Sequence, residues 1–233
     1  MRATTIRFTE DLWQQLERES AAQGTSAAQL IRDATILRLA HLAGRRGDPE
    51  ALATIEGLAA RAVRAPRPVP ELADEDRLAA LRRTALLDRP SDPALDRIAR
   101  LAQRLLRAPV ALVSLIDRDR QFMTSCIGLP EPWASRRELP LSHSICQHAV
   151  VSREALVVGD ARDHPELRDN LAITELGAVA YAGVPLVVEG GHALGTLCVA
   201  DAEPRVWSGE DVATLRDLAA SAVSELTLRL RAA

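Results

Sequence analysis

Residues 93–122 read PALDRIARLAQRLLRAPVALVSLIDRDRQF, and this stretch decides the fold of most of the chain. Its first part repeats apolar residues every three or four positions, which predicts an amphipathic helix over residues 92–106. The positions in register are Leu95, Ile98, Leu101, Ala102 and Leu105. Its second part, residues 110–117, is a short apolar run that predicts a buried strand. A helix that leads directly into a buried strand indicates a mixed α and β domain.

The pattern continues on both sides of this stretch. Further strands are predicted at residues 155–160, 182–188 and 193–201, with Gly190-Gly191 as a hairpin turn between the last two. Helices are predicted at residues 74–87 and from Ser208 onward. The closing helix carries an apolar stripe at Val212, Leu215, Ala219, Ala222, Leu226 and Leu230. This stripe can pack on the chain's own sheet or pair two chains as in a coiled coil, and the pattern does not choose between them.

Residues 74–230 resemble a GAF domain of the bacterial signal-sensing type. The motifs that carry the resemblance are, in order, DRLAALRRTALLD, PALDRIARLAQRLLRAPVALVSLIDRDRQF, SHSICQHAV, ALVVGDARDHPELRDN and YAGVPLVVEGGHALGTLCVAD. The resemblance implies an antiparallel sheet with helices on one face and a small-molecule pocket under the opposite loops. Such domains bind cyclic nucleotides, tetrapyrroles, haem or small metabolites, or only dimerise. The resemblance therefore specifies the fold better than the ligand, and any cofactor is unknown.

Candidate ligand-binding residues gather in the middle of this segment. The stretch SHSICQH at 142–148 places a thiol and two imidazoles within seven residues, and the polar run ARDHPELRDN follows a predicted strand. Polar loop residues above an apolar sheet commonly orient a ligand in its pocket. The predicted ligand-binding residues are Ser144, Cys146, His148, Asp160, Arg162, Asp163, Asn170, Tyr181 and Thr196. Arg162, together with Arg168, could meet a phosphate or a carboxylate.

Other chemistries find less support in the sequence. The thiol and imidazoles do not supply the four ligands that a zinc site normally needs, so no metal is predicted. No Ser-His-Asp order, phosphate-binding loop or paired-carboxylate signature occurs, so the sequence predicts that the chain is not an enzyme. Redox sensing through Cys126, Cys146 or Cys198 stays open, because thiol reactivity depends on exposure and pKa.

The N-terminal segment has a different pattern. Residues 4–8 alternate as a short strand, and Thr9 can cap a helix that Gly24 closes. Ser26 and Gln29 form a capping box that opens a second helix, and a weaker helical stretch covers residues 49–63. A single strand has no partner within such a small unit. Pairing of the strands of two copies would supply the missing hydrogen bonds to the backbone N–H and C=O groups, so a homodimer is expected.

The stretch TTIRFTEDLWQQLERESAAQGTSAAQLIRDAT resembles the ribbon-helix-helix family of DNA-binding proteins, over about residues 3–42. The resemblance implies a dimeric β-α-α module whose paired ribbon enters the major groove of double-stranded DNA. The ribbon would present Ala3, Thr5 and Arg7 to bases, with Arg2 as a backbone contact. Thr25, Ser26 and Ala27 would bring the second helix to a phosphate. The alternative is a ribbon that only dimerises.

Composition limits the partners and the compartment. All 29 basic residues among the 233 are arginine, which excludes lysine chemistry, and 32 acidic residues give a net charge of −3. Residues 1–46 carry a charge of only +2, so charge alone does not predict DNA binding. No apolar run approaches the ~18 residues of a membrane span. Three cysteines favour a reducing compartment, so a cytoplasmic protein with no membrane partner is expected.

Together these patterns predict an α+β chain with residues 1–46 as a ribbon-helix-helix module, 47–73 as a helical segment with a proline-containing linker, and 74–233 as a GAF domain. The predicted function is transcriptional regulation by a homodimer or dimer of dimers, with DNA binding modulated by a small-molecule or redox signal. Two alternatives stay open. The GAF domain could serve only to oligomerise a repressor, or the chain could be a sensing adaptor that does not bind DNA.

Overall fold

The computed structural model describes residues 8–22, 27–55 and 69–232. The chain divides into two units, Met1–Pro68 and Val69–Ala233. This division lies inside the segment 47–73, which contains the alternating prolines of the expected linker.

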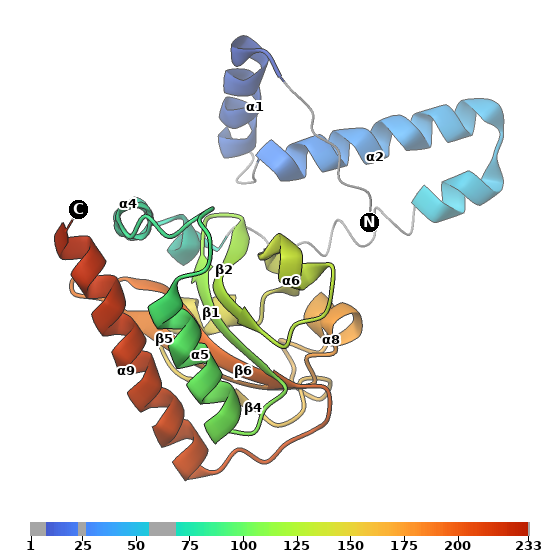
Figure 1. Ribbon diagram of the computed structural model, residues 1–233. Coiled ribbons are helices and arrows are strands. Elements are labelled where there is room, and N and C mark those ends of the chain that lie inside the picture. The colour runs from blue at the N-terminus through green and yellow to red at the C-terminus, as the bar shows by residue number, and fades with distance from the viewer. Residues whose placement is uncertain (1–7, 23–26, 56–68, 233) are drawn as a thin grey trace. The chain divides into compact units, whose positions relative to one another are not determined.

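The larger unit is built on one six-stranded antiparallel sheet in the order β3-β2-β1-β6-β5-β4 (Figure 1). The strands are β1 (Val110–Ile116), β2 (Arg120–Ile127), β3 (Glu138–Pro140), β4 (Leu156–Val158), β5 (Ala180–Val187) and β6 (Ala193–Asp201). The antiparallel sheet of the sequence-based prediction is confirmed. So is the turn at Gly190-Gly191, which joins β5 to β6 with a hydrogen bond from Gly191 N to Val188 O.

Three helices, α4 (Glu75–Arg83), α5 (Pro93–Leu105) and α9 (Gly209–Ala232), cover one face of the sheet (Figure 1). Their apolar residues meet the side chains of β1 that point to this face, such as Val113 and Leu115. The expected face of α5 needs a correction, because Leu101 and Leu105 are 47% and 58% exposed. Successive residues of a helix are about 100° apart around its axis. The face that meets the sheet is centred near Leu95 and Ala102, so Leu101 and Leu105 lie at its exposed edge.

Polar caps hold α5 and α9 in place. The Asp92 carboxylate accepts hydrogen bonds from the backbone of Ala94 and Leu95, and its second oxygen pairs with Arg229 of α9. Ser208 caps α9 as predicted, since its hydroxyl accepts from Asp211 N at 3.1 Å. The stripe of α9 is buried in the core of its own chain at Leu215, Ala219, Ala222 and Leu226. Of the two alternatives for the stripe, packing on its own sheet is therefore the one observed.

The other face of the sheet carries shorter elements and loops. They are α6 (Trp133–Arg136), α7 (Cys146–Ser152), α8 (Leu171–Leu176) and the 3-10 turns η1 (Pro70–Ala73) and η2 (Leu141–His143). Because side chains alternate along a strand, Leu112 and Ile116 of β1 point to this second face. They join a separate apolar cluster beneath α7 and α8. This second layer is thinner than the helical one and contains the cavity described below.

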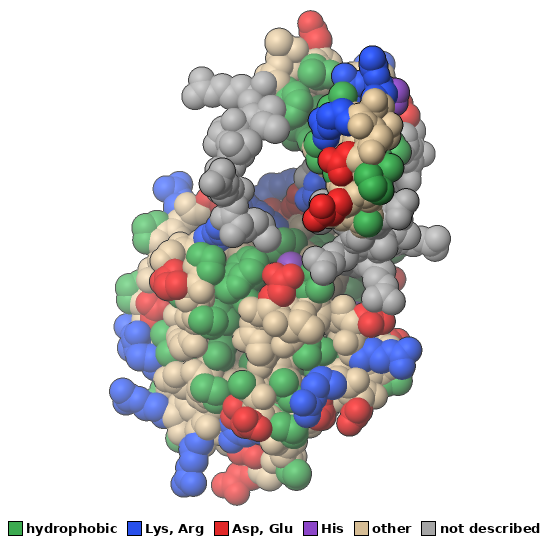
Figure 2. Space-filling view, turned by 90° about the vertical axis from the view of Figure 1, so that its right-hand side faces the viewer, with side chains coloured by type: hydrophobic (Ala, Val, Ile, Leu, Met, Phe, Trp, Pro, Cys, Tyr) green, Lys and Arg blue, Asp and Glu red, His purple; other side chains and the backbone are tan. Residues whose placement is uncertain are grey.

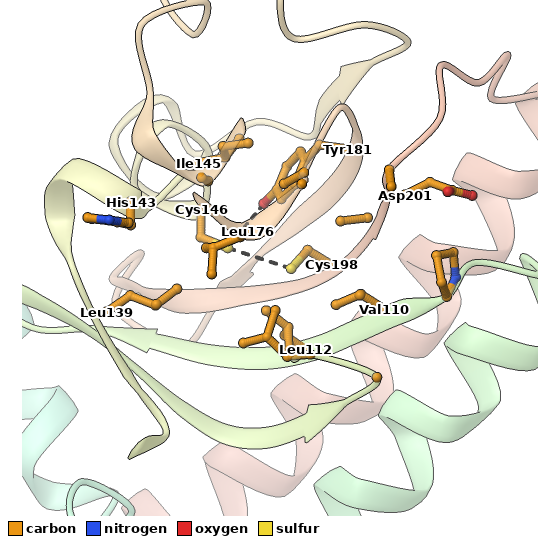
Figure 3. Close-up of a pocket in the computed structure, with 18 of the residues that line it drawn as sticks. Val110, Leu112, Leu139, His143, Ile145, Cys146, Leu176, Tyr181, Cys198 and Asp201 are labelled. Carbon is orange, nitrogen blue, oxygen red and sulfur yellow. Dashed lines mark hydrogen bonds between the residues drawn. The ribbon is translucent and has the colours of Figure 1, made fainter. Parts of the chain in front are cut away.

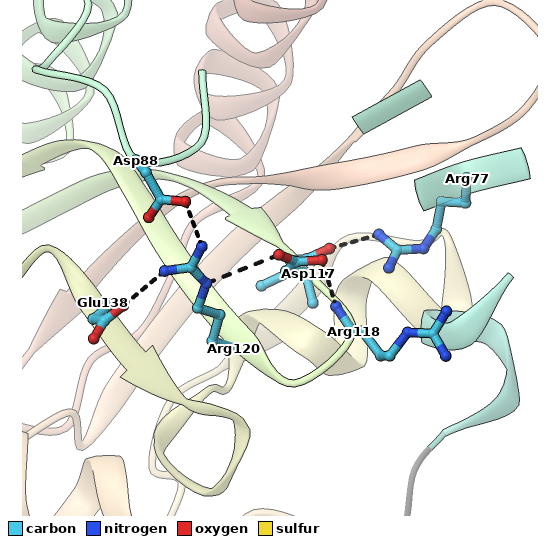
Figure 4. A network of polar contacts seen from close by, with 7 residues as sticks. Arg77, Asp88, Asp117, Arg118, Arg120 and Glu138 are labelled. Atoms are coloured by element: carbon cyan, nitrogen blue, oxygen red, sulfur yellow. Dashed lines mark hydrogen bonds and ion pairs between the residues drawn. The ribbon is translucent and has the colours of Figure 1, made fainter. Parts of the chain in front are cut away.

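A charged network fixes the hairpin between β1 and β2 (Figure 4). Arg120 pairs with Asp88 at 2.7 Å and with Glu138 at 2.8 Å, which ties β2 to β3. Beside it, the buried Arg77 of α4 donates to the carbonyl of Ile116 at 2.7 Å, and it lies next to Asp117. Arg77 therefore attaches the first long helix of this unit to the end of β1.

The smaller unit contains α1 (Glu10–Ala22), α2 (Ala27–Arg46) and a further helical stretch at residues 49–55. The two predicted N-terminal helices are thus present. A hydrogen bond from Trp13 N to Thr9 O supports the predicted start of α1 at Thr9. The predicted strand at residues 4–8 lies outside the described residues except for Phe8, and so does the end of the predicted helix over 49–63.

Candidate functional site

A cavity of about 240 Å³ lies between the sheet and the loops of its second face (Figure 3). Its floor comes from neighbouring central strands, where register places Leu112 of β1 opposite Cys198 of β6. Tyr181 of β5 forms one wall. Cys146, the first residue of α7, and Leu176 of α8 close the cavity from the loop side. Most of the lining is apolar, so polar contact with a ligand is limited to a few groups.

Two thiols and one phenol form the polar centre of the cavity. The Tyr181 hydroxyl donates to Cys146 Sγ at 3.3 Å, and Cys146 Sγ lies 3.6 Å from Cys198 Sγ. Gly183 makes this arrangement possible, because a Cβ at that position would lie 2.2 Å from Tyr181 Oη. A larger residue at 183 would push the tyrosine ring away from the thiols.

This packing changes the acidity of the two thiols in opposite directions. Hydrogen bonding with the Cys198 thiol lowers the pKa of Cys146 to about 7, with help from the hydroxyls of Thr196, Tyr181 and Ser114 and against the effect of burial. The same hydrogen bond, together with burial, raises the pKa of Cys198 well above its ordinary value. The two sulfurs form one coupled site in which Cys146 ionises first.

The two ends of the cavity carry different groups. At one end, His143 is 5% exposed, its Nε2 lies 3.0 Å from a carboxylate oxygen of Glu175 on α8, and its ring lies beside Trp133. At the other end lies Asp201, whose carboxylate points away from the cavity and pairs with Arg205 at 3.2 Å (Figure 3). A ligand in the cavity would therefore meet an imidazole at one end, and the carboxylate at the other end is already paired.

A buried chain of hydrogen bonds supports the wall near Cys146. Ser144 Oγ donates to Gln121 Oε1 at 2.6 Å, and Gln121 Nε2 donates to Ser114 Oγ at 2.9 Å. Asn170 Nδ2 donates to the carbonyl of Ser144 at 3.2 Å, which connects the loop before α8 to the same wall. These bonds fix the backbone immediately before α7 and so fix the position of its first residue.

The structure brings together only part of the predicted ligand-binding set. Cys146 and Tyr181 line the cavity, and Tyr181 lies buried near the start of β5. Ser144, Asn170 and Thr196 lie behind the lining residues.

The other predicted residues lie away from the cavity lining. His148 is half-buried on α7, where burial lowers its pKa. Asp160 pairs with Arg162 at 2.5 Å, and Asp163 is exposed on the same loop, as is Arg168. The Asp160 carboxylate also accepts from the backbone N of Arg162, so these charges stabilise their own turn.

The predicted ligand-binding set omits four polar lining residues, namely Gln121, His143, Cys198 and Asp201, although Cys198 was named as a candidate for redox sensing. A signal for Cys198 was present, because Thr196 and Cys198 lie two positions apart on a predicted strand and their side chains therefore point to the same face. Gln121 and Asp201 depend on the pairing register of distant strands, which periodicity does not reveal. His143 was within the quoted motif, but its pairing with Glu175 joins residues far apart in sequence.

The described residues contain neither a cluster of metal ligands nor a membrane-spanning helix. Among them, no three His, Cys, Asp or Glu side chains lie close enough together to hold a metal ion. No helix in the same ranges has the length and apolar character to cross a bilayer. Arginine and acidic side chains are interspersed on the face shown in Figure 2 rather than gathered by sign.

An antiparallel sheet with helices on one face and a small cavity on the other defines a domain of the α+β class. The family model described as GAF domain matches residues 91–226, and the chain belongs to this family. The expected GAF resemblance is thereby confirmed. The match begins at residue 91, so it leaves the ribbon-helix-helix prediction for residues 1–46 unconfirmed.

Individual proteins share this likeness. A Pseudomonas aeruginosa protein named cyclic di-GMP phosphodiesterase PA2567 is 34% identical over 165 residues, which is 70% of this chain and 27% of the relative. The chain thus spans about a quarter of that relative's length. The GAF domain of a Coxiella burnetii phosphoenolpyruvate-protein phosphotransferase is 20% identical with a TM-score of 0.51, covering 68% of this chain and 96% of that one. That of an Acinetobacter phosphoenolpyruvate-protein phosphotransferase is 20% identical with a TM-score of 0.49, covering 67% and 96%.

One prediction from the sequence has to be corrected. The lack of familiar catalytic motifs predicts that the chain is not an enzyme, and the phosphodiesterase name of its 34% identical relative contradicts this. The prediction rested on short motifs of well-known hydrolases and transferases. Similarity over 165 residues can relate a chain to a named enzyme even where these short motifs are absent.

Proposed function

We propose that residues 69–233 sense a small, mostly apolar molecule in the cavity between the sheet, α7 and α8. The observation that carries the proposal is the pairing of an apolar lining with a few convergent polar groups, which is the usual composition of a ligand pocket. The groups that would orient the ligand are Tyr181 and the two thiols in the centre, with His143 at one end.

Charge and size narrow the class of ligand. None of the described residues that line the cavity is an arginine, and the sequence contains no lysine. A phosphate or carboxylate on the ligand would therefore find neither of these cationic side chains among the described lining residues. The volume of about 240 Å³ also lies below the ~300–1,000 Å³ of most drug-sized ligand sites. We therefore favour a compact neutral or cationic molecule over a nucleotide.

Three probes with one ring system and different charges test this class. Indole is neutral, tryptamine is cationic, and indole-3-acetate is anionic. We expect the neutral or cationic probe to raise the melting temperature of the full chain most, because binding to the native state stabilises it. Ala178→Phe, which fills the cavity, should abolish the shift, whereas Ala155→Phe outside the cavity should keep it. A preference for the carboxylate, or an equal shift in both variants, would contradict the proposal.

For the N-terminal unit we propose DNA binding as a ribbon-helix-helix dimer that receives the signal. Its support is the order of α1 and α2 after the expected strand, together with an apolar groove of about 370 Å³ between these helices. Leu12, Leu16 and Ile31 are among the residues that line the groove. A unit of this size gains stability when a second copy covers such a surface, and pairing of the ribbons would provide that copy.

Selection from a pool of random duplexes at fixed salt tests the DNA-binding proposal. The full chain should enrich a two-fold symmetric sequence, because a symmetric dimer presents the same ribbon to each half-site. The double variant Thr5→Ala/Arg7→Ala should lose this enrichment, while Arg18→Ala on α1 should retain it. Enrichment of the same sequence by the double variant would remove the ribbon from the interface. Failure to enrich any sequence would favour the adaptor alternative.

A second candidate function is hydrolysis of cyclic di-GMP, which the similarity to the Pseudomonas aeruginosa phosphodiesterase favours. The cavity does not suit that anionic dinucleotide, so this activity and ligand sensing are separable. Incubation of the purified chain with cyclic di-GMP and Mg²⁺ should yield the linear dinucleotide on chromatography. Complete recovery of the cyclic form, with a known phosphodiesterase active in parallel, would eliminate this candidate.

A further inference from the structure

Two cysteine thiols from different elements meet at the cavity wall (Figure 3). Cys146 begins α7 and Cys198 lies in the middle of β6, 52 residues further along the chain. Their Sγ atoms are 3.6 Å apart, and both are free thiols at most 3% exposed. The sulfurs are in van der Waals contact, and a disulfide would shorten their separation to about 2.05 Å.

The cavity gives small molecules access to this pair although both side chains are almost fully buried. Both cysteines belong to the cavity lining, whereas Cys126, which is half-buried at the end of β2, does not. A molecule of the size of hydrogen peroxide can therefore approach the pair from inside the cavity.

The surroundings of the pair favour the thiolate of Cys146. Tyr181 Oη donates to its sulfur, and the buried Thr196 hydroxyl lies beside the same sulfur without a well-aligned hydrogen-bond partner among the described residues. The pKa of Cys146 falls to about 7, chiefly through hydrogen bonding with Cys198. Burial instead raises the pKa of Cys126 to about 11. Because the thiolate is the reacting form, Cys146 is the nucleophile of the three.

We propose that Cys146 and Cys198 form a peroxide-sensitive dithiol, in which a small hydroperoxide converts the pair to an intramolecular disulfide. The Cys146 thiolate attacks one oxygen of the hydroperoxide, the O–O bond breaks, and the departing oxygen takes a proton to leave as an alcohol or water. The sulfenic acid on Cys146 is then attacked by the Cys198 sulfur. The S–S bond forms and water leaves with the Cys198 proton. The dithiol is oxidised by two electrons and the hydroperoxide is reduced by two.

Oxidation would also change the cavity. Bringing the sulfurs from 3.6 Å to bonding distance draws the start of α7 toward β6 and removes the hydrogen bond that Cys146 accepts from Tyr181. The biological role of the disulfide as a signal rests on the sensing function proposed above. The formation of the bond does not, since it requires only a peroxide-sized oxidant.

Peptide mapping of the full chain tests the proposal without any substitution. Because the chain has no lysine, trypsin cleaves it only at arginine, and the three cysteines fall in separate peptides, 121–136, 138–153 and 169–205. After treatment with hydrogen peroxide at neutral pH and blocking of free thiols, we expect 138–153 joined to 169–205, with 121–136 blocked. A dithiol reductant should restore three blockable thiols.

Variants define which sulfur reacts first. Cys126→Ser should form the same disulfide at an unchanged rate and serves as the matched control. Cys198→Ala should react more slowly, because it loses the hydrogen bond that chiefly lowers the pKa of Cys146, and it should stop at a sulfenic acid on Cys146, detectable with dimedone. Cys146→Ala should give neither product. Both alanine variants should unfold cooperatively on heating. The missing disulfide is then due to the missing thiol and not to misfolding.

Several results would overturn the proposal. One is a cross-link that includes peptide 121–136, and another is a dimer linked through Cys126. A third is the absence of the 138–153 to 169–205 link in folded chain whose Cys126 is already oxidised. If the disulfide forms but indole probes do not bind, the dithiol stands and the small-molecule function fails. If the probes bind but the disulfide does not form, the small-molecule function stands and the dithiol fails.

Discussion

At the scale of single residues, the candidate site depends on how Tyr181 is held. Its ring crosses the wall of the cavity because Gly183 leaves room for it, and its hydroxyl ends on the Cys146 sulfur. The position of one phenol therefore influences both the shape of the cavity and the acidity of a thiol. This dependence can be tested separately from any ligand.

Tyr181→Phe should raise the pKa of the Cys146 thiol above about 7, because the variant removes one hydrogen bond to the thiolate. The thiolate fraction at neutral pH should fall, and oxidation by peroxide should slow in the same proportion. The measurement is the pH dependence of thiolate ultraviolet absorbance in a Cys126→Ser background, with the tyrosine-containing chain as control. An unchanged midpoint would show that the hydroxyl does not stabilise the thiolate.

At the scale of elements, the close contact between β1 and β6 supports both layers. A Cβ on Gly195 would lie 1.8 Å from the Ser114 carbonyl oxygen, so the strands cannot keep their register with a larger residue there. Gly195→Ala should therefore lower the free energy of unfolding by more than about 3 kcal/mol in urea denaturation. Gly209→Ala at the start of α9 meets nothing within 4 Å and should be neutral or slightly stabilising. Similar effects of the two substitutions would be inconsistent with this packing.

The attachment of α4 to the hairpin gives a second prediction at this scale. Arg77 is 4% exposed and donates to the carbonyls of Ile116 and Leu72, with burial lowering its pKa against the opposing effect of Asp117. Arg77→Met should destabilise the fold by about 3–5 kcal/mol, since it leaves two buried carbonyl acceptors unpaired and removes a buried cation beside Asp117.

The matched control is Arg118→Met, whose side chain is 50% exposed and pairs with Glu75 on the surface. Its loss should cost at most about 1 kcal/mol. Thermal unfolding of both variants provides the comparison. Equal losses would mean that the Arg77 bonds contribute no more than a surface ion pair.

The elements also show what the sequence could predict. Long periodic segments such as α5 and the apolar run of β1 were predicted because each is set by its own residues. The three-residue β3 was not, since Glu138–Pro140 is too short for an alternating pattern to stand out. In the site, Cys146 and Tyr181 were predicted from their motifs. The Asp160–Arg162 pair was placed in the site because a polar loop sequence does not reveal that its charges bind each other.

At the scale of the whole molecule, the proposed function requires that ligand binding in one unit is coupled to DNA binding by the other. If a ligand in the GAF cavity changes the DNA affinity of the N-terminal unit, DNA must change the affinity for that ligand by the same factor. Titration of the best-binding indole probe with and without the selected duplex measures this factor. We expect equal fold-changes in the two directions. An effect on neither affinity would support the alternative in which the GAF domain only oligomerises the chain.

The proposed sensing function requires that the cavity between the sheet, α7 and α8 holds a small molecule. Native mass spectrometry of the chain purified gently from its own cells tests it most directly, because the method reports a retained ligand by its mass. We expect one added small neutral or cationic compound per chain, which is lost in Ala178→Phe and kept in Ala155→Phe. Retention of the same compound by Ala178→Phe would contradict the account, since it would place the ligand outside the cavity.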